Sequence, residues 1–302
     1  MHRLIKKPIE RAISSPAVTW MTVRRLREKR LILAYHGIIP DGESPAGERT
    51  IFVAQRDFAM QLDLLAAEAD VVPLDRIDDA GDGRPRVAIT FDDAYSGAVN
   101  QGVQELAKRG LPATIFVVPG RLNGHVFWWD ALSHVSATLD AGVRRHALEE
   151  LSGADERVRA WAANEALPAS DALPAYARAA TRAELAAALT FPGITVGSHT
   201  WSHRNLAVLS ASDVDAEVRG SREWLRAEFG DRAIDWLAYP YGLDSVDVHH
   251  AVARASYQGA VRIAGGWHRA SEVSPFARPR FSIGSGLSVA GLRARLHGAV
   301  LS

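Results

Sequence analysis

Two short stretches of the sequence carry side chains that could bind a metal ion. Asp92 and Asp93 follow the apolar run VAITF, and His199 and His203 lie four residues apart in HTWSH. On a helical turn this spacing puts both imidazoles on one face, where they could hold one cation. Two histidines and one aspartate would leave the fourth tetrahedral position of a zinc ion open for water. The pattern therefore indicates a catalytic metal site.

The two adjacent aspartates cannot share one task. Successive residues of an extended strand point to opposite faces, so one carboxylate could bind the metal while the other faces the substrate as a base. The charge of the metal would offset their repulsion and keep both ionised at neutral pH. Simpler interpretations are a solvated acidic turn and a chance pair of histidines. The apolar residues before Asp92 argue against the turn.

The composition limits the metal chemistry and the partners. Of 302 residues, 47% are hydrophobic and 23% charged, as in an ordinary soluble globular protein. Lys and Arg number 35, the same as Asp and Glu, so the net charge gives no reason to expect nucleic acid as a partner. The chain has no cysteine, which leaves histidines and carboxylates as the ligands of any metal.

The first 30 residues depart from this balance, with nine Lys or Arg against Glu10 and Glu28. Ser, Thr and Pro interrupt the apolar segment between the basic clusters, so it is a poor signal-peptide core, and no later run is long enough to span a membrane. This basic leader could contact anionic lipid, or it could be a solvated helix that precedes the fold. We expect a cytoplasmic protein, with possible association at the inner membrane surface.

Short apolar runs alternate with helical patterns along most of the chain. Continuous apolar runs are typical of parallel strands buried on both faces, and their alternation with helices indicates a barrel or an open doubly wound sheet. The expected strands are 31–37, 87–93, 113–120, 193–199, 235–242 and 259–266, and the expected helices are 57–69, 97–110 and 210–230. The Ala-rich segment from about 130 to 190 has no strand-like run, so we expect a helical insertion within one domain spanning 31–302.

Polar residues follow several of the expected strands. His36, the two aspartates, His199 and Tyr241 all come at the carboxyl end of an apolar run. In a parallel β/α barrel these ends share one face, where active sites are built. We therefore expect these side chains to form one site.

In this order, TFDDAY, SHTWSH and YPYG resemble the motifs of the polysaccharide deacetylases with NodB homology, carbohydrate esterase family 4. The resemblance extends over about residues 30 to 285 and includes LAYHGI and GLPATIFVVPG. The early YHG is most similar to the branch that contains poly-N-acetylglucosamine deacetylases, in which the histidine-bearing strand is N-terminal. The resemblance implies a distorted (β/α)7-type barrel.

Carried over to this chain, the family pattern implies Asp93, His199 and His203 as metal ligands and Asp92 as the general base that activates water. Zn²⁺ is the expected metal, although Co²⁺ or Ni²⁺ would fit the same ligands. The metal and the backbone N–H of Tyr241 would stabilise the oxyanion. His36 would protonate the departing amine, unless it is a buried histidine bonded to the backbone.

The sequence departs from the family pattern at three positions. Ala94 replaces the usual glycine of TFDDG, and Ala238 stands where the third motif often carries an arginine that holds the base. Arg280, in RPRFSI near the end of a late strand candidate, is our predicted substitute. No Leu-x-His motif occurs near the C-terminus, and His297 lies in an expected terminal helix, which favours His36 as the acid.

Two tryptophans in FWWD, Trp128 and Trp129, are predicted to bind substrate by stacking on a sugar ring, with core packing as the alternative. Tyr241 is a further predicted substrate contact. The expected reaction is metal-dependent removal of an N-acetyl group from a sugar in a polysaccharide or a lipid-linked glycan precursor. Two other functions remain open: hydrolysis of a small non-sugar amide, and non-catalytic glycan binding or assembly. The presence of every catalytic residue type argues against the last.

Overall fold

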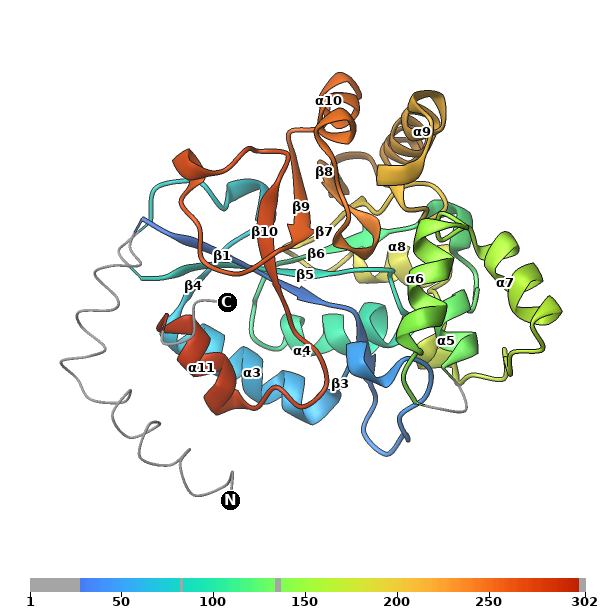
Figure 1. Ribbon diagram of the computed structural model, residues 1–302. Helices are drawn as coiled ribbons and strands as arrows, with labels where there is room; N and C mark the ends of the chain where they lie inside the picture. Colours follow the sequence, from blue (N-terminus) through green and yellow to red (C-terminus); the bar gives the residue numbers. More distant parts are fainter. Residues whose placement is uncertain (1–27, 82–83, 134–136, 299–302) are drawn as a thin grey trace, which may run out of the picture.

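The computed structural model describes residues 28–81, 84–133 and 137–298, and a closed barrel of parallel strands forms its centre (Figure 1). The order around the barrel is β1-β10-β9-β8-β7-β6-β5, and pairing of β5 with β1 closes the ring. The strands are β1 (Arg30–Tyr35), β5 (Arg86–Phe91), β6 (Ala113–Val117), β7 (Ile194–Ser198), β8 (Ala233–Ala238), β9 (Gly259–Ile263) and β10 (Arg278–Ser282). This confirms the predicted (β/α)7-type barrel and excludes the open doubly wound sheet.

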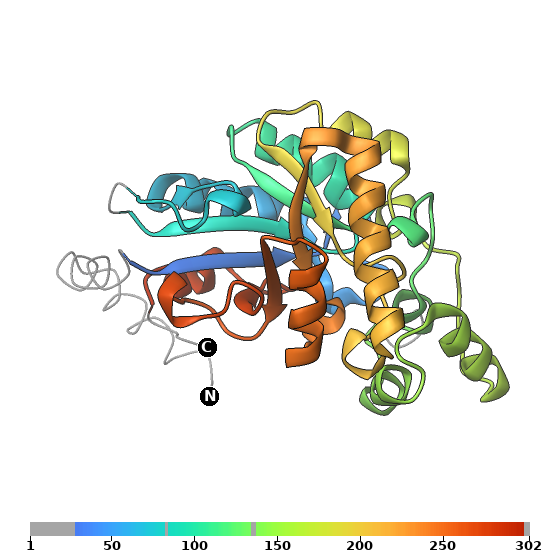
Figure 2. The same cartoon turned by 90° about the horizontal axis from the view of Figure 1, so that it is seen from above.

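Three short strands lie outside the ring. β4 (Asp70–Val71) pairs with the first residues of β5, while β6 pairs with its last residues. β2 (Gly37–Ile39) and β3 (Phe52–Ala54) form a separate parallel pair just after β1. In Figure 2 β1, in blue, runs alongside the teal β5.

The barrel strands are buried because both of their faces are covered. Inside the barrel, Ile32, Ala88, Phe116, Ala238 and Val261 come from five different strands and pack into one apolar cluster. A larger cluster lies between the strands and the surrounding helices. This two-sided burial is the physical reason why the strands are continuous apolar runs in the sequence.

Helices cover the outside of the barrel (Figure 1). They are α3 (Gln55–Glu68), α4 (Val103–Ala107), α9 (Ala211–Phe229), α10 (Val246–Arg254) and α11 (Val289–Leu296). The Ser210 side chain caps α9 by accepting from the N–H of Asp213, and Gly230, with φ 53°, ends it. The expected helix 97–110 is present to Ala107, with a π-helical segment, Ala98–Gly102, followed by α4. Glycine at position 97 lets this helix pack closely on β2, since a Cβ there would lie 2.0 Å from the Ile38 carbonyl oxygen.

The described residues between β6 and β7 form helices and no strand. They are α5 (Trp128–Leu132), α6 (Ala141–Glu149), α7 (Asp155–Asn164) and α8 (Arg182–Ala188), drawn in green to yellow at one side of the barrel in Figure 1. The first of these helices, α5, contributes residues to the site described below.

Most of the basic leader, residues 1–27, lies outside the described residues. Among the helices that the structure does describe, none combines the length and the apolar character needed to cross a membrane.

Candidate active site

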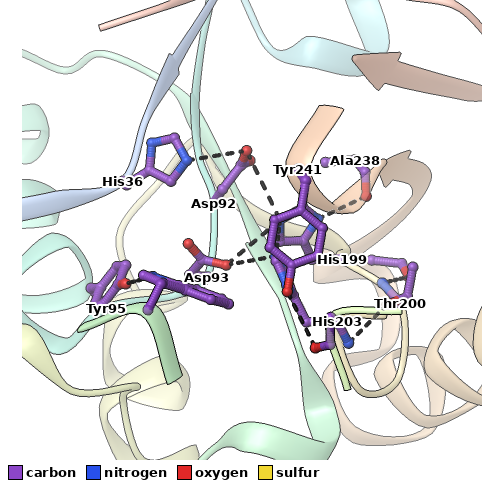
Figure 3. A network of polar contacts seen from close by, with 12 residues as sticks. His36, Asp92, Asp93, Tyr95, His199, Thr200, His203, Ala238 and Tyr241 are labelled. Atoms are coloured by element: carbon purple, nitrogen blue, oxygen red, sulfur yellow. Dashed lines mark hydrogen bonds and ion pairs between the residues drawn. The ribbon is translucent and has the colours of Figure 1, made fainter. Parts of the chain in front are cut away.

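The register between β1 and β5 places His36 beside Asp92. The two strands pair residue by residue up to Tyr35 opposite Phe91, and the N–H of Asp92 donates to the Tyr35 carbonyl at 2.9 Å. His36 and Asp92 are the next residues of their chains, and His36 Nε2 lies 3.9 Å from Asp92 Oδ2 (Figure 3). The predicted acid and base therefore come from adjacent strand ends.

Arg280 holds the carboxylate of Asp92. Its two terminal nitrogens donate to the two Asp92 oxygens at 2.7 Å each, and Nη1 also donates to Thr90 Oγ1 at 3.0 Å. The Arg280 side chain is fully buried. Burial alone would raise the pKa of Asp92, but the Arg280 guanidinium holds that pKa well below its usual range. The structure thus places Arg280 on the carboxylate that the arginine missing at Ala238 was expected to hold.

The turn after Asp92 directs Asp93 away from Arg280. Asp93 and Ala94 have φ angles of 67° and 51°, in the left-handed region that side chains with a Cβ seldom adopt. This conformation explains why the similar motifs carry glycine where this chain has Ala94. The neighbouring carboxylates face different partners, as predicted, but the left-handed turn separates them and not the alternation of side chains along an extended strand, since β5 ends at Phe91.

His199 and His203 meet across a loop and not, as we predicted, across a helical turn. His199 follows β7, and its N–H donates to the Val117 carbonyl of β6 at 2.8 Å. Thr200 and His203 then adopt φ angles of 64° and 63°, and the N–H of His203 donates to Thr200 Oγ1. The two left-handed residues fold the loop back on itself, so the imidazoles converge without a helix.

Three ligand atoms of Asp93, His199 and His203 point at one buried position (Figure 3). Asp93 Oδ1 lies 3.6 Å from His199 Nε2 and 3.2 Å from His203 Nε2, and the two nitrogens are 3.1 Å apart. Asp93 Oδ1 has no hydrogen-bond partner among the described residues. A buried carboxylate oxygen without a donor, beside two imidazoles, is the arrangement that a bound cation would satisfy.

The protonation of the histidines also fits a cation. His199 Nδ1 donates to the Ala238 carbonyl at 2.7 Å, which leaves the lone pair of Nε2 directed at Asp93. Burial lowers the pKa of His199 to about 4 and that of His203 to about 3, so both rings are neutral at pH 7. Burial raises the pKa of Asp93, and a nearby positive charge would lower it again. The three residues therefore fit a divalent metal with N and O ligands.

A pocket opens above these residues at the carboxyl ends of the strands. The predicted site residues His36, Asp92, Asp93, His199, His203, Tyr241 and Trp129 line it, together with Glu48, Ile51, Arg144, Gly242, Ile263 and Ser282. Glu48 and Arg144 were not predicted from the sequence, because Glu48 comes from the segment between β2 and β3 and Arg144 from α6. Neither residue follows a barrel strand, and the site residues were predicted from positions at the carboxyl ends of strands.

Tyr241 lies in the segment after β8 with φ 60° and ψ 5°. Its hydroxyl accepts from Trp128 Nε1 at 3.1 Å and donates to the Gly153 carbonyl at 3.3 Å. The Tyr241 ring packs against the ring of His203 with centroids 4.6 Å apart. These contacts fix the side chain of Tyr241 between the insertion helices and the histidine loop.

The structure corrects the stacking prediction for Trp128. This side chain is fully buried, and its indole N–H is bonded to Tyr241, so it has no face open to a sugar. Trp129 is 6% exposed and lines the pocket, where it packs on His203 with ring centroids 4.8 Å apart. Core packing, the alternative weighed for both tryptophans, is the role of Trp128.

His297 lies away from the pocket. It caps the end of α11, and its Nε2 lies 2.8 Å from Glu68 Oε2 on α3. The terminal helix was expected, and the position of His297 agrees with the exclusion of this residue from the site.

Comparison with known proteins gives the family. Residues 79–260, more than half of the chain, match the family model described as polysaccharide deacetylase. No curated protein shows significant sequence similarity to the chain.

Solved structures share the fold at low sequence identity. The deacetylase PplD from Streptococcus pyogenes, solved with acetate, has a TM-score of 0.64 at 19% identity, with 89% of this chain and 98% of that chain covered. IcaB from Ammonifex degensii has a TM-score of 0.62 at 15% identity, with 90% and 98% covered. BC0361, a polysaccharide deacetylase from Bacillus cereus, has a TM-score of 0.62 at 18% identity, with 89% and 69% covered.

The family match covers the turn with the two aspartates, the histidine loop and β8, whereas the pocket residues His36, Glu48, Ile51, Ile263 and Ser282 lie outside it. On this match the chain belongs to the polysaccharide deacetylase family and is a hydrolytic N-deacetylase acting on sugar amides.

Proposed function

We propose that this protein uses a divalent metal, Zn²⁺ in the first place, to hydrolyse the N-acetyl group of a sugar in a polysaccharide or a lipid-linked glycan precursor. The observation that carries the proposal is the buried group of Asp93, His199 and His203, which lies next to an Arg280-bound Asp92. Zn²⁺ bound there would act as a Lewis acid on the acetamide carbonyl and would make water more acidic.

Asp92 is the proposed general base. The Arg280 guanidinium keeps its carboxylate ionised and fixes both oxygens, so Asp92 is ready to accept a proton without a search for the productive orientation. Asp92 Oδ2 lies 4.0 Å from His199 Nε2, which puts the base next to the metal ligands without making it one of them. Arg280 acts through Asp92 and is therefore a positioning residue.

His36 is the proposed acid. Burial lowers the pKa of His36, while the neighbouring Asp92 opposes this shift, so the imidazole is neutral at pH 7 before the reaction. The proton that His36 gives to the departing amine would come from Asp92, whose Oδ2 is 3.9 Å from His36 Nε2. The water then supplies its hydroxyl to the acetyl carbon and its proton, through Asp92 and His36, to the nitrogen.

The backbone N–H of Tyr241 is the proposed second contact of the oxyanion. Tyr241 occupies a left-handed turn at the end of β8, and its anchored side chain stabilises that turn. Trp129, at the pocket wall, is the proposed aromatic contact of the sugar. A lipid-linked substrate would bring the enzyme to a membrane surface, and the basic leader is the segment that would contact anionic lipid there.

Acetate release from a panel of N-acetylated oligosaccharides and lipid-linked sugars tests the proposal. We expect release from at least one substrate, loss of release with a chelator and recovery with added Zn²⁺. Asp92→Asn should lower the rate of acetate release by at least about 10²-fold while sugar binding persists. Asp215→Asn, on the exposed surface of α9, is the matched control and should leave release unchanged.

Acetate release by folded Asp92→Asn protein at the wild-type rate would contradict the mechanism. Release that a chelator does not reduce would contradict the metal requirement. Sugar binding without release from any substrate by the metal-loaded wild-type protein would indicate a glycan-binding protein.

A further inference from the structure

The two histidines of the proposed metal site are held in different ways. His199 Nδ1 donates to the Ala238 carbonyl, which fixes its ring by a hydrogen bond. His203 Nδ1 is buried and has no hydrogen-bond partner among the described residues. Its ring lies instead between two aromatic rings, Trp129 at 4.8 Å and Tyr241 at 4.6 Å. The orientation of His203 therefore depends on what fixes those rings.

Trp129 is itself fixed by a short hydrogen-bond chain. Its indole N–H donates to the hydroxyl of Tyr95 at 2.9 Å. Since an indole nitrogen only donates, the Tyr95 oxygen is the acceptor, and the Tyr95 hydrogen goes to Asp130 Oδ2 at 2.5 Å. The ring of Trp129 also stacks on Phe127, with centroids 4.5 Å apart and planes 10° from parallel. Rotation of Trp129 would break the chain.

Asp130, the last member of these hydrogen bonds, is an acidic residue in the interior of the protein. It is fully buried, and its other oxygen accepts from the backbone N–H of Glu48 at 2.8 Å. No cation is paired with this carboxylate among the described residues, and burial raises its pKa to about 7. The adjoining loop makes room for it, because a Cβ on Gly47 would lie 2.5 Å from Asp130 Oδ1. A buried carboxylate without a counter-ion costs stability, so packing alone does not explain it.

The same hydrogen bonds also lead to the turn that carries Asp93, on the other side of the metal site. Tyr95 follows the left-handed turn of Asp93 and Ala94 by one residue, and Trp129 and Asp130 belong to α5 of the insertion. One hydroxyl group thus links the turn that carries Asp93 to the ring that packs on His203.

We propose that Asp130, Tyr95 and Trp129 form a positioning network that sets the orientation of His203, so that the helical insertion completes the metal site of the barrel. This inference rests on the proposed function, because it assumes that His203 binds the metal. Ligand-orienting groups of this kind change metal affinity by about 10- to 100-fold when they are removed.

Metal affinity of single variants tests the network. Tyr95→Phe keeps the ring and removes the hydroxyl, Asp130→Asn keeps the shape and removes the charge, and Trp129→Phe keeps an aromatic ring and removes the N–H. Tyr176→Phe is the matched control: like Tyr95, this buried tyrosine packs on Phe52, but its hydroxyl donates to the Ser44 carbonyl and is not part of the proposed network.

Zn²⁺ affinity is measured by competition with a chromophoric chelator, and the visible absorption of Co²⁺-loaded protein reports the ligand geometry. Thermal unfolding of the metal-free variants shows which of them are folded. We expect Zn²⁺ binding by Tyr95→Phe and Asp130→Asn to be about 10- to 100-fold weaker, with an altered Co²⁺ spectrum, and binding by Tyr176→Phe to be within about twofold of wild type.

Two results would overturn the inference and leave the proposed function standing. One is wild-type Zn²⁺ affinity together with a wild-type Co²⁺ spectrum in the folded variants. The other is an equal loss in Tyr176→Phe, which would show a general effect of removing a buried hydroxyl. If Tyr95→Phe does not fold, Trp129→Phe decides the matter by the same two readouts. Failure of the folded wild-type protein to bind Zn²⁺ or Co²⁺ would instead contradict the proposed metal site itself.

Discussion

Asp92 and Arg280, 188 residues apart in the chain, form a buried two-point ion pair in which each carboxylate oxygen accepts from a different guanidinium nitrogen at 2.7 Å. The pair forms because β5 and β10 both flank β1 in the barrel. Inside the barrel, the Arg280 guanidinium also lies over the ring of Phe116, which packs in the same apolar cluster as Ala238. The positive charge that the third motif lacks is thus supplied from another strand.

Replacement of Arg280 should affect both stability and the pH dependence of catalysis. Arg280→Ala leaves the Asp92 charge buried without a partner, so we expect a loss of about 3–5 kcal/mol in the free energy of unfolding. The pKa of Asp92 should rise, because its shift below the usual range depends on Arg280. The acid limb of the kcat/KM profile should therefore move to higher pH, with a rate loss of about 10²-fold at pH 7.

The double variant Arg280→Ala/Ala238→Arg is the rescue control. Both positions are fully buried in the barrel, so an arginine at 238 should recover part of the lost rate if charge on Asp92 is what matters. A pH profile of the folded Arg280→Ala protein identical to that of wild type would contradict the positioning role.

The loss of kcat on replacing His36 should be larger for substrates whose leaving group needs a proton. An amine departs only when protonated, whereas a nitrophenolate does not need a proton. We expect His36→Gln to lower kcat by about 10²- to 10⁴-fold on an N-acetylated sugar and by less than about tenfold on a nitrophenyl acetate ester. Parallel assays of the two substrates with one enzyme preparation measure this ratio. Equal losses on both substrates would assign His36 to some task other than proton donation.

The histidines of the site should make the stability of the metal-free protein fall at pH values well above those at which carboxylates titrate. His199 and His203 have pKa values lowered by burial to about 4 and about 3. As pH falls below about 6.5, the unfolded chain takes up protons that the folded protein does not, so the folded state loses stability. The loss should approach about 1.4 kcal/mol per pH unit for each histidine and end below the folded pKa values.

Urea unfolding with a chelator present, at intervals from pH 7 to pH 4, measures this slope. His199→Asn/His203→Asn should flatten it, while His250→Asn, at an exposed position of α10, should not. An unchanged slope in the double variant would show that other buried groups cause the acid sensitivity.

The side chain of Tyr241 should contribute to stability more than to catalysis. The proposed oxyanion contact uses its backbone N–H, and its hydroxyl is occupied by Trp128 and Gly153. We expect Tyr241→Phe to lower the free energy of unfolding by about 1 kcal/mol and to keep kcat within about threefold of wild type. Trp128→Phe removes the same hydrogen bond and also leaves a cavity in the core, so it should cost more stability than Tyr241→Phe and likewise keep kcat within about threefold of wild type. A kcat loss above about 100-fold in Tyr241→Phe alone would show that the hydroxyl itself takes part in the reaction.

Local pattern was enough to predict parallel strands alternating with helices and the residues that gather at the strand ends, while the resemblance to the deacetylase motifs favoured the barrel over an open sheet. Strands buried on both faces are continuous apolar runs, and parallel strands in one barrel end on one face, so His36, Asp92 and His199 could be assigned to one site before any contact was known. The different tasks of Asp92 and Asp93 were also predicted, although a left-handed turn and not alternation along a strand separates the two side chains.

Backbone conformation in the loops lay beyond local pattern. The spacing of His199 and His203 suggested a helical turn, but Thr200 and His203 are left-handed, a state that few residues other than glycine adopt and that the sequence did not indicate at these two positions. The burial of Trp128 was equally hidden, because an aromatic pair at the start of a helix is compatible with both core and surface.

The sequence by itself determined the α/β class, through its periodicity, and the chemical types of the site, through the residues at the strand ends and the motifs that resemble a known family. The pairing of Arg280 with Asp92 was predicted from the sequence and is present in the structure. Only the tertiary structure decided that Tyr241 is anchored by Trp128 and that Asp130 and Tyr95 reach Trp129 beside His203. These contacts join residues far apart in the chain, and closure of the barrel and docking of the insertion bring them together. Such distances depend on packing between elements, which no local sequence pattern specifies.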